Sequence, residues 1–579
     1  MHRALKLAAL MFLCGWTTPP LHAQDISQIA QSDPLIITGA VGTQNTYHYS
    51  SAGNGYASPF SSMFYANLNV SVYGFNMPFS ISYSNSNWEY NYPHFTLSLT
   101  PQYKNWTGYI GQSSMNMSSY VMNMGFNGIG VEYQGERFRA GIFYGVLHKA
   151  INDDPTDPFA RSPQMKRVGW GFKVGYGTST NYIDLYLLRA YDQPNSIDER
   201  WRSRVTPEEN IVVGLKGGVM PTKWLSFTAN AAVSAFNTDR TAPKIETDET
   251  QRFDKIFSTR YSSLARFAGD VGANVSLAGI NASLIYRLIQ PDYTSLGTYY
   301  MSNNYHSLGL TLSTVLFKRV ALSATFSGQA DNLTKRQLYT TNGYVYGAFA
   351  STRLGQHFNL SASYNGYLQN QSDGTAQVTD STRVNRRMSS FTFTPSYNTE
   401  SEHLGHTVSL STAYTSNKDL NKYATGESDV KSLSLGLAYD LGVKAWEVNF
   451  MMSLNHQESR GYKTKYSSEI ATLGASRSFL QQKNLTLSAS CSLCYNEVEH
   501  QSKSLSMGGN LNCSYMLKEV HAFTAQACFN KYGDVNITKV RSHLDDTDIS
   551  VSFSYAYTFS LLHIKSKATK QREAEEKKK

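Results

Sequence analysis

The segment DISVSFSYAYTFSL, Asp548 to Leu561, alternates bulky apolar side chains with small or polar ones. Side chains alternate across a β-strand with a period of two, so the segment predicts a strand with one apolar and one polar face. It is long enough to cross a bilayer, because a tilted transmembrane strand needs roughly 9–11 residues. An apolar outer face rich in aromatic residues and a polar inner face are typical of a transmembrane β-barrel.

The same alternation recurs along the chain from Leu35 onward. Leu433, Leu435, Leu437 and Tyr439, for example, alternate with Ser432, Ser434, Gly436 and Ala438. Counting such segments predicts an all-β fold, a single large antiparallel barrel of about 26 strands. The barrel is expected to span residues 35–562.

The connections between these segments alternate in length. Short turns, such as Gly135-Glu136 and Lys518 to Val520, are followed by longer polar connections. The longer ones include 50–62, 150–166, 192–208, 238–258, 370–386 and 533–546. Outer-membrane barrels have short periplasmic turns and longer extracellular loops, and an even strand count places both termini in the periplasm.

The ends of the chain predict export. Arg3 and Lys6 precede the apolar run 7–16, and Leu21-His22-Ala23 is a plausible cleavage site, so residues 1–23 resemble a signal peptide. Residues 24–34 would be a short periplasmic lead, too short for the plug of a TonB-dependent receptor, and 563–579 a basic periplasmic tail. The predicted location is the outer membrane of a Gram-negative bacterium.

The composition agrees with a barrel and argues against a nucleic-acid-binding protein. The chain has 13% aromatic and 16% charged residues, with a mean hydropathy of −0.37. The net charge is +9, but residues 1–23 and 565–579 supply most of it and leave +3 for the rest. A chain of this length with so small a remaining charge has no basic face for nucleic acid.

Several stretches of the first half resemble a large, uncharacterised family of outer-membrane barrels from Bacteroides-type bacteria. They are ITGAVGTQNTYHYSS (37–51), PFSSMFYANLNVSVYGFNMPFSISYSNSN (59–87), GVEYQGERFRAGIFYGVLHKA (130–150), GWGFKVGYG (169–177) and ENIVVGLKG (209–217). The resemblance covers mainly residues 35–240. It implies the barrel fold and the outer-membrane location, and it carries over no activity.

No catalytic motif stands out, so the chain is not expected to be an enzyme. The sequence has no GxSxG, HExxH or P-loop pattern, and no cofactor is expected. Glu400, Glu402, His403 and His406 at one short turn are a weak zinc candidate, for which a solvated turn is the favoured interpretation. The same holds for calcium at two loop clusters, Asp153, Asp154 and Asp157, and Asp545, Asp546 and Asp548.

Five charged residues on the polar phase form the one candidate site. Glu132 and Arg139 flank a short turn symmetrically and are expected to be cross-strand partners, as are Lys173 and Asp184 at the next such turn. Lys216 lies on the same phase of the following strand. They would form a rim inside the periplasmic mouth, or would simply neutralise one another as structural pairs.

The cysteines also follow the strand phases. Cys491 and Cys494 are three residues apart, which places them on opposite faces of one strand. Cys491 and Cys513 are expected to face lipid, and Cys494 and Cys528 the lumen.

Two functions fit these expectations. The first is passage of a bulky solute or polypeptide, gated by inward-folded loops or by a partner. The second is a plugged barrel that acts as a binding or scaffold protein, whose loops or tail recruit a periplasmic or surface protein. Outer-membrane lipid would be a partner in either case.

Overall fold

The computed structural model describes residues 33–51, 59–85, 95–152, 162–247, 257–480, 482, 484–499, 501–534, 546–565 and 569. The expected signal segment, most of the lead and nearly all of the tail therefore lie outside the described residues. The described residues include no helix that is long and apolar enough to cross a membrane.

The first half of the sheet consists of short and medium strands. They are β1 (Leu35–Ser50), β2 (Phe60–Val72), β3 (Phe75–Ser84), β4 (Phe95–Leu99), β5 (Gln102–Tyr103), β6 (Trp106–Ser113), β7 (Phe126–Gln134), β8 (Phe138–His148), β9 (Lys166–Gly177), β10 (Tyr182–Gln193), β11 (Glu209–Thr222), β12 (Leu225–Asn237), β13 (Ser263–Leu277) and β14 (Ile280–Ile289). The helical turns η1 (Pro194–Ser196) and α3 (Glu199–Arg202) lie between β10 and β11.

The second half continues with longer strands. They are β15 (Tyr305–Leu316), β16 (Val320–Asp331), β17 (Tyr339–Leu354), β18 (Phe358–Asp373), β19 (Asn385–Glu400), β20 (Leu404–Asp419), β21 (Val430–Val443), β22 (Val448–Arg460), β23 (Lys465–Phe479), β24 (Leu485–Val498), β25 (Ser502–Leu517), β26 (His521–Asp534) and β27 (Thr547–Ile564).

The strands form one closed antiparallel barrel. Each strand pairs with its neighbours in the chain, and β27 pairs with β1 along the whole of β1, from Leu35 opposite Ile564 to Ser50 opposite Asp548. β4 and β5 are two pieces that both pair with β3 and β6, so the wall has 26 strands with β5 as one extra short strand. The expected count of about 26 is confirmed, and the last strand ends two residues beyond the expected limit, at Ile564.

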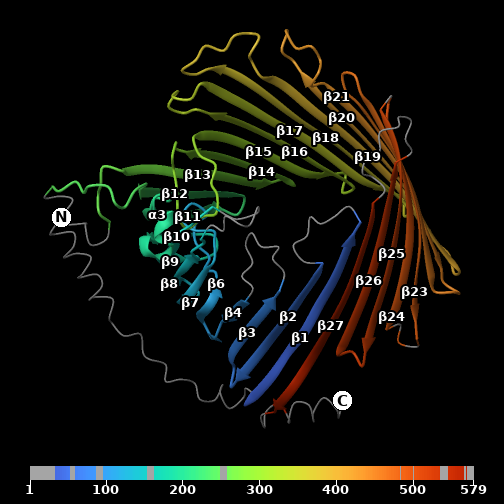
Figure 1. The fold of residues 1–579 in the computed structure, drawn as a ribbon, viewed down its shortest axis with the longest axis horizontal. Helices are drawn as coiled ribbons and strands as arrows, with labels where there is room; N and C mark the ends of the chain where they lie inside the picture. Colours follow the sequence, from blue (N-terminus) through green and yellow to red (C-terminus); the bar gives the residue numbers. More distant parts are fainter. Residues whose placement is uncertain are drawn as a thin grey trace.

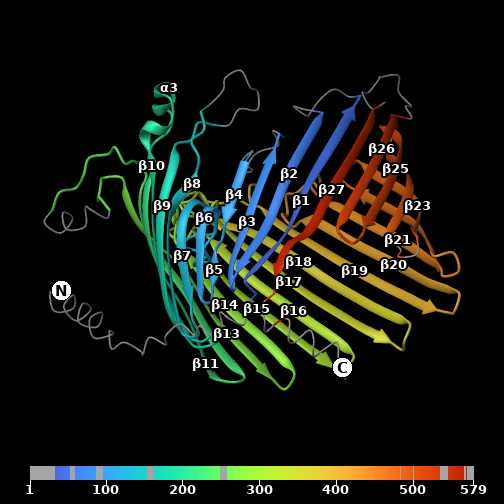
Figure 2. The ribbon, with the colours of Figure 1, turned by 90° about the horizontal axis from the view of Figure 1, so that it is seen from below.

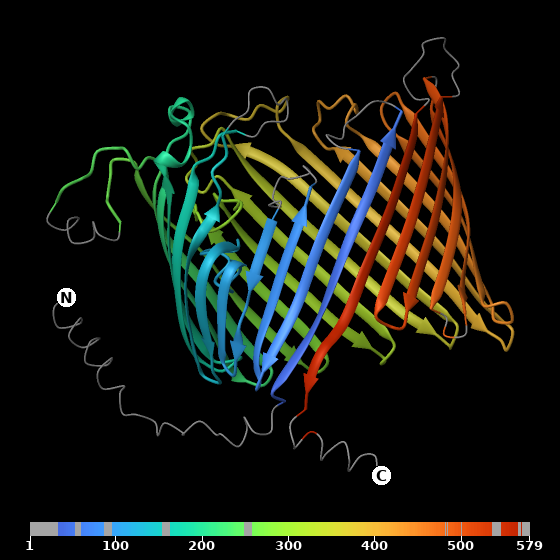
Figure 3. The same ribbon diagram turned by 60° about the horizontal axis from the view of Figure 1, so that its bottom comes forward.

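Figure 1 shows the sheet closed into an elongated ring, with β6–β12 curving round one end. The strands are strongly tilted, and α3 stands beyond the rim at the end of β10 (Figure 2). β1 begins and β27 ends at the rim that carries the short turns, while α3 and the longer loops lie at the opposite rim (Figure 3). We call these the short-turn rim and the long-loop rim.

The outer surface of the barrel is apolar. Exposed side chains such as Ile129, Ile142, Leu215, Leu437 and Leu511 occur on strands all round the wall, on the phase that points away from the lumen. So large an apolar surface is stable only when a nonpolar medium covers it. Because every wall strand is paired on both sides, the backbone has no open edge that such a medium would leave unsatisfied.

Candidate functional site: an inner lobe beside an open lumen

Two connections at the long-loop rim fold into the barrel instead of away from it. The first is residues 114–125, between β6 and β7, with the sequence SMNMSSYVMNMG. Its four methionines, Met115, Met117, Met122 and Met124, are all buried. Met side chains fill irregular space well because they are unbranched and flexible. The second connection is residues 290–304, between β14 and β15, and together we call these two segments the inner lobe.

Backbone and side-chain hydrogen bonds join the two segments of the inner lobe. Met122 and Gly297 form a parallel bridge, and Asn123 and Met124 donate their backbone N–H groups to the Gly297 carbonyl at 3.1 and 3.2 Å. The Tyr293 hydroxyl donates to the Tyr120 carbonyl at 2.8 Å, and the Ser295 hydroxyl donates to the Val121 carbonyl at 2.5 Å. The lobe is therefore a single unit built from segments about 170 residues apart in the chain.

Polar side chains of the barrel wall hold this lobe in place. The Tyr120 hydroxyl donates to Asp270 on β13 at 2.5 Å, and the Ser118 hydroxyl donates to Asn230 on β12 at 2.7 Å. On β11, Asn210 is fully buried and accepts a hydrogen bond from the Leu296 backbone N–H at 3.1 Å. Burying such groups is costly unless each finds a partner, so these bonds specify where the lobe docks.

The apolar core of the protein lies between this lobe and the wall. Val121, Leu188 and Val212 are fully buried, and the Phe126 and Phe143 rings stack with centroids 4.4 Å apart. Each such side chain contributes about 1.5–3 kcal/mol when it is buried. Among the described residues, the buried hydrophobic side chains lie within 66–296, with Val378 the exception. The lobe therefore fills only the end of the lumen enclosed by β6–β14.

The five charges expected at a lumenal rim all point into the barrel, but their partners differ from those expected. Glu132 pairs across strands with Gly141, not Arg139, and forms its ion pair with Lys173 at 2.6 Å. Lys173 lies opposite Tyr186, not Asp184. Asp184 instead binds Arg139 at 2.8 Å. The expected cross-strand pairs were wrong because both hairpins are centred one residue later than expected, with turns at 135–137 after β7 and at 178–181 after β9.

Each of the two ion pairs spans a glycine on the strand between its members. Gly141 lies directly opposite both Glu132 and Lys173, and Gly175 lies directly opposite both Arg139 and Asp184. A Cβ atom at Gly175 would overlap Asp184 Oδ1. The glycines therefore leave the space through which a charge on one strand reaches a charge two strands away.

Lys216 completes a row of alternating charge on the lumenal wall. Successive pairing places Arg139, Gly175, Asp184, Lys216, Asn230, Asp270 and Arg287 in register across β8–β14. No ion pair joins Lys216 to another residue of the described ranges. The row ends at Asp270, the acceptor for Tyr120, and at Arg287 beside it. The charged wall is thus the wall against which the inner lobe packs.

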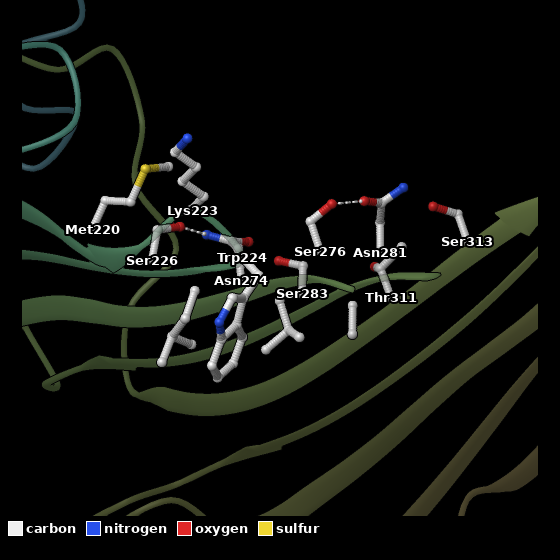
Figure 4. Close-up of a pocket in the computed structure, with 13 residues that line it drawn as sticks. Met220, Lys223, Trp224, Ser226, Asn274, Ser276, Asn281, Ser283, Thr311 and Ser313 are labelled. Carbon is white, nitrogen blue, oxygen red and sulfur yellow. Dashed lines mark hydrogen bonds between the residues drawn. The ribbon is translucent and has the colours of Figure 1, made fainter. Parts of the chain in front are cut away.

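Between the charged row and the short-turn rim, the lumenal side chains of β12–β15 carry no charge. Figure 4 shows the transition near the short-turn rim, where Ser226, Asn274, Asn281, Ser283 and Ser313 point to one side and Trp224 to the other. Asn281 accepts a hydrogen bond from the Ser276 hydroxyl at 2.5 Å. The hydroxyl and amide side chains of these strands therefore form a wettable inner surface, with Trp224 on the outer one.

A second charged group, which the sequence did not single out, ties the strand ends together at the long-loop rim. Arg167 binds Asp192 at 2.8 Å and Glu208 at 2.7 Å, while Arg189 binds Glu209 at 2.7 Å. Asp192 and Glu209 are almost completely buried. Buried pairs of this kind fix geometry, because removal of one partner leaves an uncompensated charge.

The weaker candidates do not form a metal site in the described residues. Glu400 binds Lys444 at 2.7 Å, and His406 Nδ1 lies 2.9 Å from the Tyr439 hydroxyl. Asp153, Asp154, Asp157 and Asp545 lie outside the described residues. The four cysteines of the described barrel are free, and Cys494 shares the lumenal phase with Ser468, whose hydroxyl lies 3.6 Å from its sulfur.

The closed wall, the apolar outer surface and the polar lumen define a transmembrane β-barrel of the outer-membrane class. No family model and no curated protein matches the chain. Among solved structures, it resembles OccAB3 of Acinetobacter baumannii at 10% identity, over 61% of this chain and 93% of that one, with a TM-score of 0.30. It also resembles the translocation pore of the P pilus usher PapC at 9% identity, over 90% and 99% of the two chains, with a TM-score of 0.33. The outer-membrane protein OpdK of Pseudomonas aeruginosa is similar to the same degree as OccAB3, with 10% identity over 61% and 94% and a TM-score of 0.30. The resemblance is distant and assigns no family.

Proposed function

We propose that the protein is an outer-membrane channel that lets a bulky, water-soluble solute pass beside the inner lobe. The observation that supports this proposal most directly is that the lobe fills only one end of the lumen. Its core is confined to the side of β6–β14, and the lumenal side chains elsewhere are mostly polar and are accessible. A barrel of about this many strands leaves a wide interior unless something fills it.

In this proposal the inner lobe sets the narrowest width of the passage. It is docked through hydrogen bonds to single side chains, Asn210, Asn230 and Asp270, and its own packing relies on methionines. The two segments of the lobe are continuous with the wall strands at their ends, but neither is itself a strand of the wall. The short-turn rim, where β1 begins and β27 ends, faces the periplasm, as short turns do in outer-membrane barrels.

The alternative is a barrel whose lobe serves to hold it rigid while its rim or tail binds a partner protein. The observation that favours it is the extent of the lobe's buried core. Both functions place the protein in the outer membrane, and they differ in whether water and ions cross it.

Single-channel conductance of the purified protein in a planar bilayer tests the proposal. A large and steady ion conductance is expected from a lumen that is open beside the lobe. A folded sample, identified by its heat-dependent mobility in detergent gels, that conducts no ions would overturn the proposal and leave the scaffold function. A variant lacking 115–124 should conduct more than the full chain if the lobe sets the width, and equally if it does not.

A further inference from the structure

An apolar strip interrupts the polar lumen wall on β17–β19. It differs from the charged row on β8–β14, against which the inner lobe packs. Val345 on β17, Tyr367 on β18 and Met388 on β19 lie directly opposite one another in register. Their exposed fractions are 49%, 37% and 47%, and Phe349, on the same face of β17, is 43% exposed. We call these four residues the lumenal strip.

The pairing register places this strip inside the barrel. The lumenal row that contains Asp270 and Arg287 continues through Ser307, Gln329, Gly343 and Gln369. Val345 is two residues from Gly343, and Tyr367 is two residues from Gln369, so both share the lumenal phase. The neighbouring Tyr364 has the opposite phase and belongs to the outer surface. Exposed apolar groups are expected outside such a barrel, and inside they require another explanation.

The surroundings of the strip are neutral and rich in hydrogen-bonding groups. The lumenal positions beside it along the strands and across the pairing are Gln329, Ser363, Asn365, Gln369 and Ser390. One charged side chain is near, Arg386, which lies opposite both Gln369 and Asp419 in register. The strip therefore presents an apolar face edged by amides and hydroxyls, without a concentration of charge of one sign.

A second exposed aromatic group lies on the inner lobe. Tyr299 and Tyr300 are 70% and 81% exposed, although Ser295, Leu296 and Gly297 shortly before them are buried. The backbone N–H of Tyr299 is held by Asn123 Oδ1 at 3.3 Å, which fixes this end of the segment to the rest of the lobe. The two phenol rings at this end of the lobe are therefore covered neither by the wall nor by the rest of the lobe.

We propose that the lumenal strip and the two lobe tyrosines bind an uncharged oligosaccharide in transit. Sugar rings have apolar C–H faces that pack on aromatic and aliphatic side chains, and hydroxyl groups round the edge that bond to amides and hydroxyls. The lumenal strip supplies the aromatic and aliphatic side chains, and the residues that border it supply the amides and hydroxyls. A polypeptide would need partners for charges of both signs, and most charged residues of β8–β14, Lys216 excepted, are already paired with one another or with the lobe. This inference rests on the proposed passage function and names its solute class.

The test is block of ion conductance by neutral hexasaccharides: maltohexaose, cellohexaose and mannohexaose, each added to the long-loop side of the bilayer. At least one is expected to interrupt the current reversibly, and a galacturonic acid hexamer of the same length is expected to block less. Tyr367→Ala should weaken the block about tenfold, the loss expected for one aromatic contact, and Tyr300→Ala should slow association. Tyr364→Ala, on the outer face of the same strand, is the matched control and should block as the unaltered protein does.

The outcomes separate the two proposals. A large conductance that none of the three neutral hexasaccharides blocks would overturn the saccharide inference and leave the channel. If the protein does not conduct, the channel proposal fails. Titration calorimetry of the folded protein in detergent with the same sugars then tests whether the lumenal strip binds saccharide. Binding heat that is lost in Tyr367→Ala and kept in Tyr364→Ala supports the strip, and its absence overturns it.

Discussion

The Tyr120 hydroxyl donates a 2.5 Å hydrogen bond to Oδ2 of Asp270, so a side chain of the inner lobe ends on a carboxylate of the barrel wall. This bond joins the methionine-rich segment to the row of alternating charge on β8–β14. Among the side-chain to side-chain hydrogen bonds between the lobe and the wall, this one is expected to be the strongest. The reason is that a hydrogen bond to a charged group is stronger than one between neutral groups.

Tyr120→Phe removes this bond and keeps the ring. We expect the docking of the lobe to lose about 2 kcal/mol, the usual contribution of a hydrogen bond to a charged group. Single-channel recordings should then show frequent transitions to a higher conductance. Tyr144→Phe, which alters a ring exposed on the outer surface, is the control and should leave the traces unchanged. Identical traces for both variants would mean that the bond does not restrain the lobe.

High pH should release the lobe for a related reason. Burial raises the pKa of Tyr120, as does its hydrogen bond to Asp270, and burial raises the pKa of Tyr293. A raised pKa means that the protonated phenol stabilises the docked state fully below the ordinary value of about 10. This stabilisation is lost as the pH rises through the raised pKa. Conductance should therefore be constant from pH 7 to about 10 and increase above it, and reversal on neutralisation separates release from denaturation.

Gly175→Ala should break the Arg139–Asp184 ion pair, because the added Cβ would overlap the Asp184 carboxylate. Both partners are largely shielded from solvent, so we expect a loss of about 1–3 kcal/mol in the free energy of unfolding, measured by urea titration of the heat-modifiable form. Gly405→Ala is the matched control, because nothing lies within 4 Å of a Cβ there. Equal midpoints for the two variants would contradict the role assigned to Gly175.

Lys216 offers a test of the charged row as a selectivity element. Lys173 is held in a buried pair with Glu132, whereas Lys216 has no ion pair in the described part of the chain. Lys216→Glu should therefore shift the permeability ratio of the channel from anions towards cations, and Lys173→Glu should mainly destabilise the barrel. Lys518→Glu, in a short turn away from this wall, makes the same change of net charge. A reversal potential that Lys216→Glu and Lys518→Glu change equally would remove the row from selectivity.

Water access to the lumen can be measured with the native cysteines. Cys494 shares the lumenal phase with Ser468 and Asn496, and Cys491 on the same strand has the opposite phase. A charged maleimide should label a variant retaining only Cys494 and leave one retaining only Cys491 unmodified in a bilayer. Labelling of Cys491 alone would mean that the strand faces the opposite way.

The wall of the barrel was predictable because a strand with one face in lipid and one in water must alternate along its length. The segment 548–561 shows this directly. Its lumenal positions carry small or polar residues and its lipid-facing positions carry bulky apolar ones, so the two faces are distinct in the sequence. The lumenal phase of Glu132, Arg139, Lys173, Asp184 and Lys216 was predictable for the same reason.

The inner lobe was not predictable from the same pattern. Residues 114–125 have no alternation, and their methionines resemble neither a polar loop nor a strand. Their burial depends on Asn210, Asn230 and Asp270, which come together only when β11–β13 are aligned. The partners of the charges were missed because side chains reach across Gly141 and Gly175 to a second strand, and local symmetry about a turn carries no information on that strand.

Closure of the wall by β1 and β27 has a consequence for biogenesis. Leu35 lies opposite Ile564, so the barrel cannot close before the last strand has been synthesised and exported. Until then the sheet is open and has two unpaired edge strands. A nascent or prematurely terminated chain lacks the partner for its first strand and remains a substrate for chaperones and proteases. Because closure needs the pairing of β1 with β27, only a chain that includes β27 can form the closed barrel, which has no unpaired edge strand.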